Sequence, residues 1–217
     1  MINYRSLTDI VYDYISEQIR TKALKAGEKI NENTICDALK ISRTPVREAL
    51  IQLSKEGYIE QIPRRGFLVR EVTLERANNI YKIIGVLEAL AATDCLEHPD
   101  TLDLEVMRQL AHQMDDAIDQ KDYDLYYNLQ NRFHSTFIQA SGNEDLIRIL
   151  ESLKKTFIKQ AYSSSESEEL YQEALHLTNE EHWKILKLFE AGEAEALRRF
   201  VRDVHWHVKY ADMEILI

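Results

Sequence analysis

The spacing of hydrophobic residues in the first third of the chain changes from a helical period to an alternating one. Apolar residues recur every three or four positions over residues 6–20 and 31–40, which predicts an amphipathic helix followed by a short one. A third helix is expected from residue 42 to Gly57. The strings YIEQI and FLVREV then alternate apolar and polar residues around a PRRG turn, which is typical of a β-hairpin. This order of elements predicts a winged helix-turn-helix domain over residues 1–72.

The rest of the chain keeps a helical period. Helices are expected over residues 73–95, 102–121, 123–140, 143–161 and 170–177, from Thr178 onward, and from Gly192 past Tyr210. A fresh helix or a kink is expected at Thr178, because Thr178 and Glu181 have the spacing of a capping box. In the first of these helices, five apolar residues are expected to face inward: Ile80, Ile83, Leu87, Leu90 and Ala91. The patterns predict a mainly α protein whose winged helix-turn-helix is followed by an all-α bundle of six or seven helices over residues 73–217.

Composition narrows the class of protein. Of the 217 residues 45% are hydrophobic and 29% charged, and only six are glycine and three proline, which is typical of a helix-rich folded chain. The first residues do not resemble a secretory signal and no run of about 18 apolar residues occurs, so we expect a cytoplasmic protein that does not enter a membrane. Cys36 and Cys95 are expected to be buried, reduced thiols.

Charge is distributed unevenly along the chain. The formal net charge of −10 argues against nucleic acid as a partner, because binding to phosphates requires lysine and arginine. However, residues 1–76 hold 13 Lys and Arg against 11 Asp and Glu, leaving 14 against 26 for residues 77–217. The first part can therefore present a local basic face to DNA, while the acidic remainder limits indiscriminate binding.

The sequence SRTPVREAL, residues 42–50, has the chemistry of a helix that reads DNA. Ser42 can cap this helix, and Pro45 falls in its first turn, where a missing N–H costs little. Arg43 and Arg47 are four residues apart and share one face. In the major groove an arginine can donate two hydrogen bonds to guanine, and Thr44 can bind a phosphate or contact a thymine methyl group.

The hairpin tip supports the same interpretation. Arg64 and Arg65 suit phosphates or the minor groove, and Gly66 lets the backbone approach closely. The stretch KAGEKINENTICDALKISRTPVREALIQLSKEGYIEQIPRRGFLV closely resembles the winged-helix domain of the GntR family of transcriptional regulators. The resemblance implies DNA contacts by Arg43, Thr44, Arg47, Arg65 and Gly66. Members of this family often carry arginine where this chain has Asn33, so a DNA contact there is expected to be weaker or differently directed.

Residues 77–210 resemble the FCD domain of the FadR-type subfamily, through RFHSTFIQASGNEDL and EEHWKILKLFEAGEAEALRRF. The resemblance implies a homodimer that binds a palindromic operator. It also implies a small effector, namely a carboxylate, sugar acid, amino acid or acyl conjugate, that alters the affinity for DNA. Many FCD domains hold a divalent metal ion as well.

The metal pattern of FCD domains is an acid or amide four residues before a histidine, followed by two histidines on later helices. His134 and His182 match this pattern, with Gln130 in the position of the acid. The family spacing places the last histidine at Val204. This chain has His205 instead, which would be turned by about 100° around a regular helix.

Two interpretations of the histidines remain open. In one, His134 and His182 line the pocket or are hydrogen-bonded in the core without a metal. In the other, they bind a zinc or nickel ion together with His205, and Gln130 or water completes the coordination. The same four side chains are the candidate effector contacts. Ile84 stands where family members hold a ligand carboxylate with an arginine, so recognition of the effector is expected to differ.

We interpret the chain as a sequence-specific DNA-binding transcriptional regulator, a repressor, whose operator affinity responds to a small effector. One alternative is a dimeric architectural DNA-binding protein without an effector. Another is an all-α metal-dependent enzyme in which Glu180 or Glu181 acts as the base. Because a carboxylate ligand and a nucleophile-and-base motif are both missing, we expect no enzymatic activity and no catalytic residue.

Overall fold

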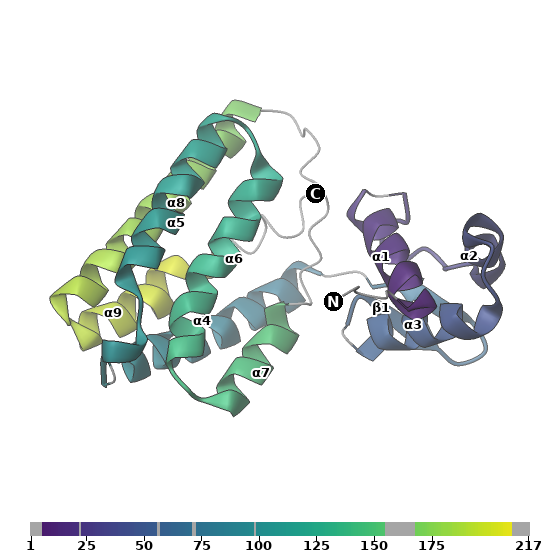
Figure 1. Cartoon of the computed structure of the whole chain (residues 1–217), viewed down its shortest axis with the longest axis horizontal. Helices are drawn as coiled ribbons and strands as arrows, with labels where there is room; N and C mark the ends of the chain where they lie inside the picture. The colour runs from purple at the N-terminus through teal and green to yellow at the C-terminus, as the bar shows by residue number, and fades with distance from the viewer. Residues whose placement is uncertain are drawn as a thin grey trace. The chain divides into compact units, whose positions relative to one another are not determined.

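The computed structural model describes residues 6–21, 23–55, 57–70, 73–97, 99–154 and 168–209. They divide into two compact units, one extending to Thr73 and one beginning at Leu74 (Figure 1). The first unit contains three helices and a hairpin, and the second is helical.

The first unit has the element order expected of a winged helix. Its elements are α1 (Leu7–Arg20), α2 (Glu32–Leu39), α3 (Arg43–Lys55), β1 (Ile59–Ile62) and β2 (Gly66–Val69). Ser6 and Asp9 form a capping box at the start of α1, in which each side chain accepts a hydrogen bond from the other residue's backbone N–H. Asn31 caps α2, and Lys40 ends it in the left-handed conformation.

A single hydrophobic core fixes the orientation of α3. Buried side chains come from all three helices and the hairpin: Val11, Ile15, Ile19, Ile35, Val46, Leu50, Leu53, Ile59, Phe67 and Val69. Burying an aliphatic side chain of this kind contributes about 1.5–3 kcal/mol. Since Val46, Leu50 and Leu53 occupy the inner face of α3, its opposite face is directed to solvent.

The hairpin forms the predicted wing. β1 and β2 pair antiparallel, in register from Ile59 opposite Val69 to Ile62 opposite Gly66. The segment before α2 also joins this sheet, because the Ile30 N–H donates to the Phe67 carbonyl at 2.9 Å. Sequence reasoning did not predict this pairing, since the segment is too short to show an alternating pattern.

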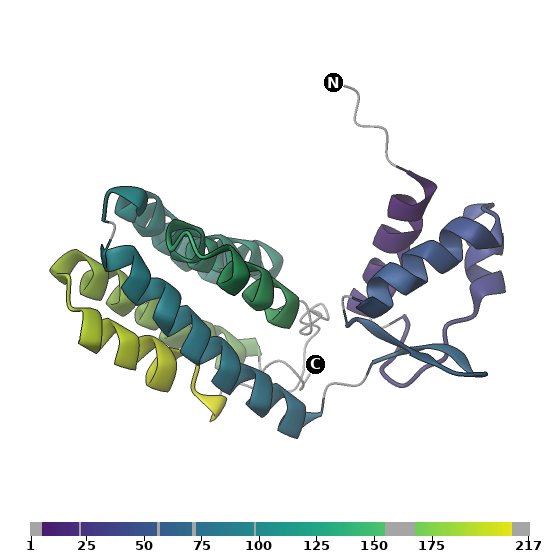
Figure 2. The ribbon, with the colours of Figure 1, turned by 90° about the horizontal axis from the view of Figure 1, so that it is seen from below.

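The second unit is the expected all-α bundle. Over the ranges described, its elements are α4 (Leu74–Glu97), the 3-10 turn η1 (Pro99–Thr101), α5 (Leu104–Asp119), α6 (Tyr123–Ala140), α7 (Glu144–Lys154), α8 (Glu168–Ala191), α9 (Ala194–Phe200) and the π-helix η2 (Val201–His205). α5 packs against α6 and α8, whereas α4 packs against α6, α9 and η2 (Figure 2). Within these ranges no helix combines the length and the apolar character needed to cross a membrane.

The prediction that a new helix begins at Thr178 is wrong. α8 runs through this position without interruption. The Thr178 hydroxyl donates to the carbonyl of Ala174, one turn earlier, at 2.9 Å. It therefore bonds within the helix instead of capping a new one.

The last predicted helix is also wrong in its extent. α9 ends at Phe200, and the backbone continues as the π-helix η2 rather than as an α-helix. The predicted end, past Tyr210, lies outside the described residues, as does the part of the fourth predicted helix between Lys154 and Ala161.

The predicted inner face of α4 is partly wrong. Ile80 and Ala91 are buried as expected and Leu87 is half-buried, but Ile83 and Leu90 are 47% and 44% exposed. The reason is that α4 is apolar over more of its circumference than its neighbours in the chain cover.

The two cysteines differ in environment. Both are free thiols, but only Cys95 is fully buried, and Cys36 is half-buried, contrary to expectation. The Cys95 thiol donates to the Phe137 carbonyl, and burial raises its pKa to about 12. Cys95 is therefore an unreactive core residue.

Candidate functional site

The exposed end of α3 carries the side chains expected to read DNA. Arg43, Thr44 and Arg47 are exposed on the face opposite the core. Pro45 is half-buried in the first turn, and the exposed Ser42 directly precedes the helix. These five residues thus lie at the N-terminal end of one helix, where free backbone N–H groups favour phosphate.

Two side chains of α2 contact the arginines of α3. The Arg43 Nη2 donates to Asn33 Oδ1 at 2.8 Å. The Arg47 Nε donates to Glu32 Oε2 at 2.8 Å, and this hydrogen bond, together with the negative charge of Glu32, raises the pKa of Arg47. Sequence reasoning missed Glu32 and identified Asn33 only as a departure from the family.

The wing tip presents the two predicted arginines to solvent. Arg64 and Arg65 are both exposed, and Arg64 adopts a φ of 65° at the turn. Gly66 follows with a φ of 90°, a conformation that strains other residues. A Cβ at Gly66 would lie 3.8 Å from the Cε atom of Lys29, so a third cationic side chain, not predicted from the sequence, borders the tip.

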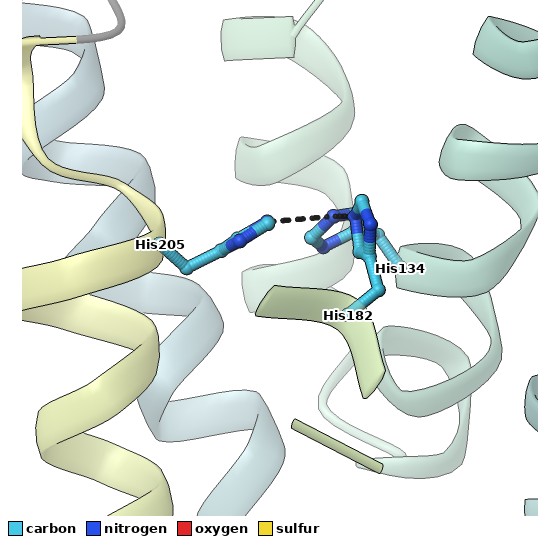
Figure 3. A group of neighbouring side chains, drawn as sticks. All are labelled: His134, His182 and His205. Atoms are coloured by element: carbon cyan, nitrogen blue, oxygen red, sulfur yellow. Dashed lines mark hydrogen bonds between the residues drawn. The ribbon is translucent and has the colours of Figure 1, made fainter. Parts of the chain in front are cut away.

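Three histidines from separate elements of the second unit meet in its interior. His134 lies on α6, His182 on α8 and His205 on η2, and all three are buried. The Nε2 atom of His134 lies 3.2 Å from the Nε2 atoms of both other rings (Figure 3). Nitrogens bound tetrahedrally to one zinc ion at about 2.0–2.1 Å would be about 3.3–3.4 Å apart, so this spacing fits a metal ion.

The π-helix η2 brings His205 into this cluster. A regular α-helix would direct position 204 inward, as the family spacing requires. In η2 the Trp206 N–H instead donates to the Val201 carbonyl five residues back, which accommodates one extra residue in the turn. As a result His205 is 5% exposed and Val204 38% exposed. The one-residue offset in the sequence is therefore compensated by the backbone.

Two carboxylates fix the orientation of the rings. Glu88 Oε2 lies 2.7 Å from His134 Nδ1, and Glu181 Oε2 lies 3.0 Å from His205 Nδ1. Because an ionised carboxylate only accepts, each Nδ1 carries the proton and each Nε2 directs a lone pair into the cluster. Lone pairs at 3.2 Å repel unless a cation or a proton lies between them. Three histidines placed in this way could hold a metal ion, with the carboxylates orienting two of the rings.

Close packing of α4 against η2 completes the site. A Cβ at Gly85 would lie 2.9 Å from the Trp206 Cβ, so only glycine permits this approach. The Trp206 indole N–H then donates to Glu88 Oε2 at 2.8 Å, and its ring packs edge-on against Tyr81. Sequence reasoning missed Glu88, Gly85 and Trp206, although an acid and a glycine within an apolar helix are a usable signal.

Two further positions named in the sequence analysis, Gln130 and Ile84, and the tryptophan that follows His182 belong to the same unit. Gln130 is half-buried one turn before His134 on α6. Ile84 is fully buried, so the position of the family arginine is filled by an apolar side chain. Trp183 donates to Asp115 Oδ2 at 3.0 Å, so its polar atom connects α8 to α5.

Comparison with known proteins agrees with both units. The family model "Bacterial regulatory proteins, gntR family" matches residues 7–69, and the FCD domain matches residues 79–205. An uncharacterized HTH-type transcriptional regulator of Bacillus subtilis, YdhC, is 30% identical over 141 residues, which are 64% of this chain and 63% of YdhC. The Escherichia coli transcriptional repressor RspR is 26% identical over 154 residues, which are 71% of this chain and 68% of RspR. The structure of E. coli McbR/YncC superposes with a TM-score of 0.72 over 98% of each chain, at 23% identity.

The chain belongs to the GntR-family transcriptional regulators that carry an FCD domain. It is a DNA-binding regulator with an effector-binding domain, and not an enzyme. This assigns the exposed end of α3 to the DNA-binding half, and the histidine cluster to the FCD half.

Proposed function

We propose that this regulator is a repressor that reads a palindromic operator as a homodimer and responds to a small anionic effector. Residues 1–72 would bind DNA, and residues 73–217 would bind the effector and dimerise. Such a regulator acts in the cytoplasm, where bacterial DNA lies. The observation that carries the proposal is the presentation of Arg43, Thr44 and Arg47 on the solvent face of a helix whose other face is locked into the core.

The operator contacts follow from the positions of the side chains. Arg43 and Arg47 would contact base edges, and Thr44 a phosphate or a thymine methyl group. The other proposed contacts are Ser42 and Pro45 at the helix start, Asn33 on α2, and Arg64, Arg65 and Gly66 at the wing tip. The wing arginines suit the minor groove or the flanking phosphates.

An apolar stripe on α4 supports the homodimer. Ile83, Val86 and Leu90 are 47%, 54% and 44% exposed, and their spacing places them on one side of the helix. Such a stripe is unfavourable in water and is typical of a surface that another protein covers. Two copies of α4 packed across a twofold axis would cover it and present two reading helices to the two halves of a palindrome.

The histidine cluster is the proposed metal and effector site. His134, His182 and His205 would hold a zinc or nickel ion through their Nε2 atoms, with Gln130 or water at a further position. The ion would supply a positive charge for an effector carboxylate, a charge that Ile84 cannot provide. Carboxylates, sugar acids and amino acids are therefore the effectors to examine first.

The test combines site selection with effector screening. Full-length protein should select one palindromic consensus from random duplexes, with affinity that falls steeply as salt concentration rises. Elemental analysis of untagged protein purified without chelator should find about one zinc or nickel per chain. Sugar acids, amino acids and dicarboxylates that raise the melting temperature are then added to the DNA complex. If no consensus is recovered, the operator proposal fails, and if no compound changes the affinity for DNA, the chain is an architectural DNA-binding protein.

A further inference from the structure

Helix α2 is directly connected to the arginines of the reading helix. It carries Asn33 and, directly before it, the acid Glu32. Asn33 accepts a hydrogen bond from Arg43, and Glu32 accepts one from Arg47, both at 2.8 Å. Two consecutive residues of α2 thus hold two residues one turn apart on α3.

The contact with Glu32 leaves one edge of the Arg47 guanidinium group available to read a base. A guanidinium group has two edges that can donate paired hydrogen bonds, one formed by Nε and one Nη, the other by both Nη atoms. Glu32 occupies the Nε of Arg47, so the edge with both Nη atoms remains for the O6 and N7 atoms of guanine. Asn33 bonds to Nη2 of Arg43 and restricts the direction in which that guanidinium points.

These contacts do little for folding stability. The Arg47 and Glu32 side chains are 64% and 21% exposed, and ion pairs this exposed contribute little to the free energy of unfolding. They do restrict long side chains that would otherwise lose conformational freedom on binding DNA. Glu32 also repels phosphates, which disfavours an Arg47 conformation directed at the DNA backbone.

We propose that Glu32 and Asn33 are positioning residues that set the direction of Arg47 and Arg43 and thereby determine which base pair each arginine reads. The inference rests on the proposed contact of both arginines with DNA. It gives Asn33 a definite role, that of the side chain whose Oδ1 accepts a hydrogen bond from Arg43.

The test compares base preference with overall affinity. Glu32→Ala and Asn33→Ala remove the acceptors, whereas Glu32→Gln and Asn33→Asp retain one. Asp37→Ala is the control for Glu32→Ala, because Asp37 is an exposed acid on another face of α2. Each full-length variant is assayed on the selected operator, on operators with single base-pair changes and on an unrelated duplex. Thermal unfolding verifies that each variant is folded.

In each alanine variant, the ratio of affinities for the preferred and the changed base pair should fall about tenfold at one position per half-site. A loss of this size is within the range expected for one bidentate contact between an arginine and a base. Glu32→Ala should bind the unrelated duplex as well as or better than wild type, because a negative charge is lost. Glu32→Gln and Asn33→Asp should restore the preference, and Asp37→Ala should leave it unchanged.

Parallel loss on all duplexes, or an unchanged preference in both alanine variants, would overturn the inference. Arg43→Ala and Arg47→Ala separate this failure from that of the proposed function. If the arginine variants change the preference and the α2 variants do not, only the positioning role is wrong. If neither the arginine variants nor the α2 variants change the base preference, the arginines themselves do not read bases.

Discussion

The buried carboxylate of Glu88 gives the histidine cluster much of its order. Glu88 is fully buried, lies 2.7 Å from His134 Nδ1 and accepts the indole N–H of Trp206. It therefore connects α4, α6 and the residue that follows η2. Gln130 is neutral, but the Glu88 and Glu181 carboxylates can offset the charge of a divalent ion, each acting through a histidine.

We expect Glu88→Gln to lower the affinity for zinc about 10–100-fold, the range for removing the partner that orients a metal-binding histidine. The amide is nearly isosteric with the carboxylate but no longer carries a charge. Competition with a chromophoric chelator measures the affinity. Glu180→Gln, at an exposed position of α8, serves as the matched control and should bind zinc as wild type does. Equal affinities for wild type and Glu88→Gln would remove Glu88 from the metal site.

Arg43→Ala tests the reading helix at its first residue. We expect a loss of about 1–3 kcal/mol on the selected operator and a relaxed preference at one base pair per half-site, because a bidentate contact to guanine is removed. Titration of labelled operator and its single-change variants measures both. An equal loss on every duplex would instead identify Arg43 as a phosphate contact.

Functional side chains that belong to a local spacing pattern could be predicted from the sequence. Side chains whose role depends on a contact with a distant part of the chain could not. Arg43 and Arg47 were found because they share a face of one helix, and His134 and His182 because they follow a family pattern. Glu88 contacts a histidine 46 residues away, and Glu32 contacts an arginine 15 residues away. Such pairs exist only once the helices have packed, and a single sequence holds no local record of them.

The backbone turn of η2 determines which side chain enters the histidine cluster, His205 or Val204. Its π geometry accommodates the extra residue before His205, and the neighbouring Gly85 leaves room for Trp206. Sequence reasoning applied a regular helix here and placed His205 out of line, because a π turn depends on packing. The capping box at Thr178 failed for a similar reason, since packing keeps α8 continuous.

Changing the length of η2 by one residue tests this account. Deletion of the exposed Val204 should convert the π turn into an α turn and keep the histidine in place, so we expect zinc affinity within about threefold of wild type. Insertion of one alanine after Val204 should turn the histidine by about 100° and abolish high-affinity binding. Chelator competition measures both, with circular dichroism as the control for folding. If the deletion alone abolished binding, the π turn would not be the element that compensates the offset.

The exposed apolar stripe on α4 is the surface that we assign to the proposed homodimer. Ile83 and Leu90 were expected to face the core, because periodicity alone does not distinguish a surface covered within the chain from one covered by a partner. The apolar periodicity therefore predicted the helix correctly, but it predicted the burial of Ile83 and Leu90 incorrectly. In the proposed dimer these side chains are buried after all, by the second copy.

Val86→Glu places a charge in the middle of this stripe, where Val86 is 54% exposed. In a monomer the substitution should be nearly neutral for folding, because the side chain remains in water. In the dimer it would bury two like charges near the twofold axis, so we expect dissociation at micromolar concentration. Affinity for the full palindrome should fall about 10²–10⁴-fold, because two linked half-site contacts become independent.

Sedimentation velocity and operator titration give the two readouts for Val86→Glu. Val106→Glu, at a 36% exposed position on α5, is the matched control and should leave both unchanged. Affinity for an isolated half-site should be the same in all three proteins, since the reading helix itself is unaltered. If Val86→Glu remained dimeric with full operator affinity, the homodimer would have to use a different surface, and the exposure of Ile83 and Leu90 would need another explanation.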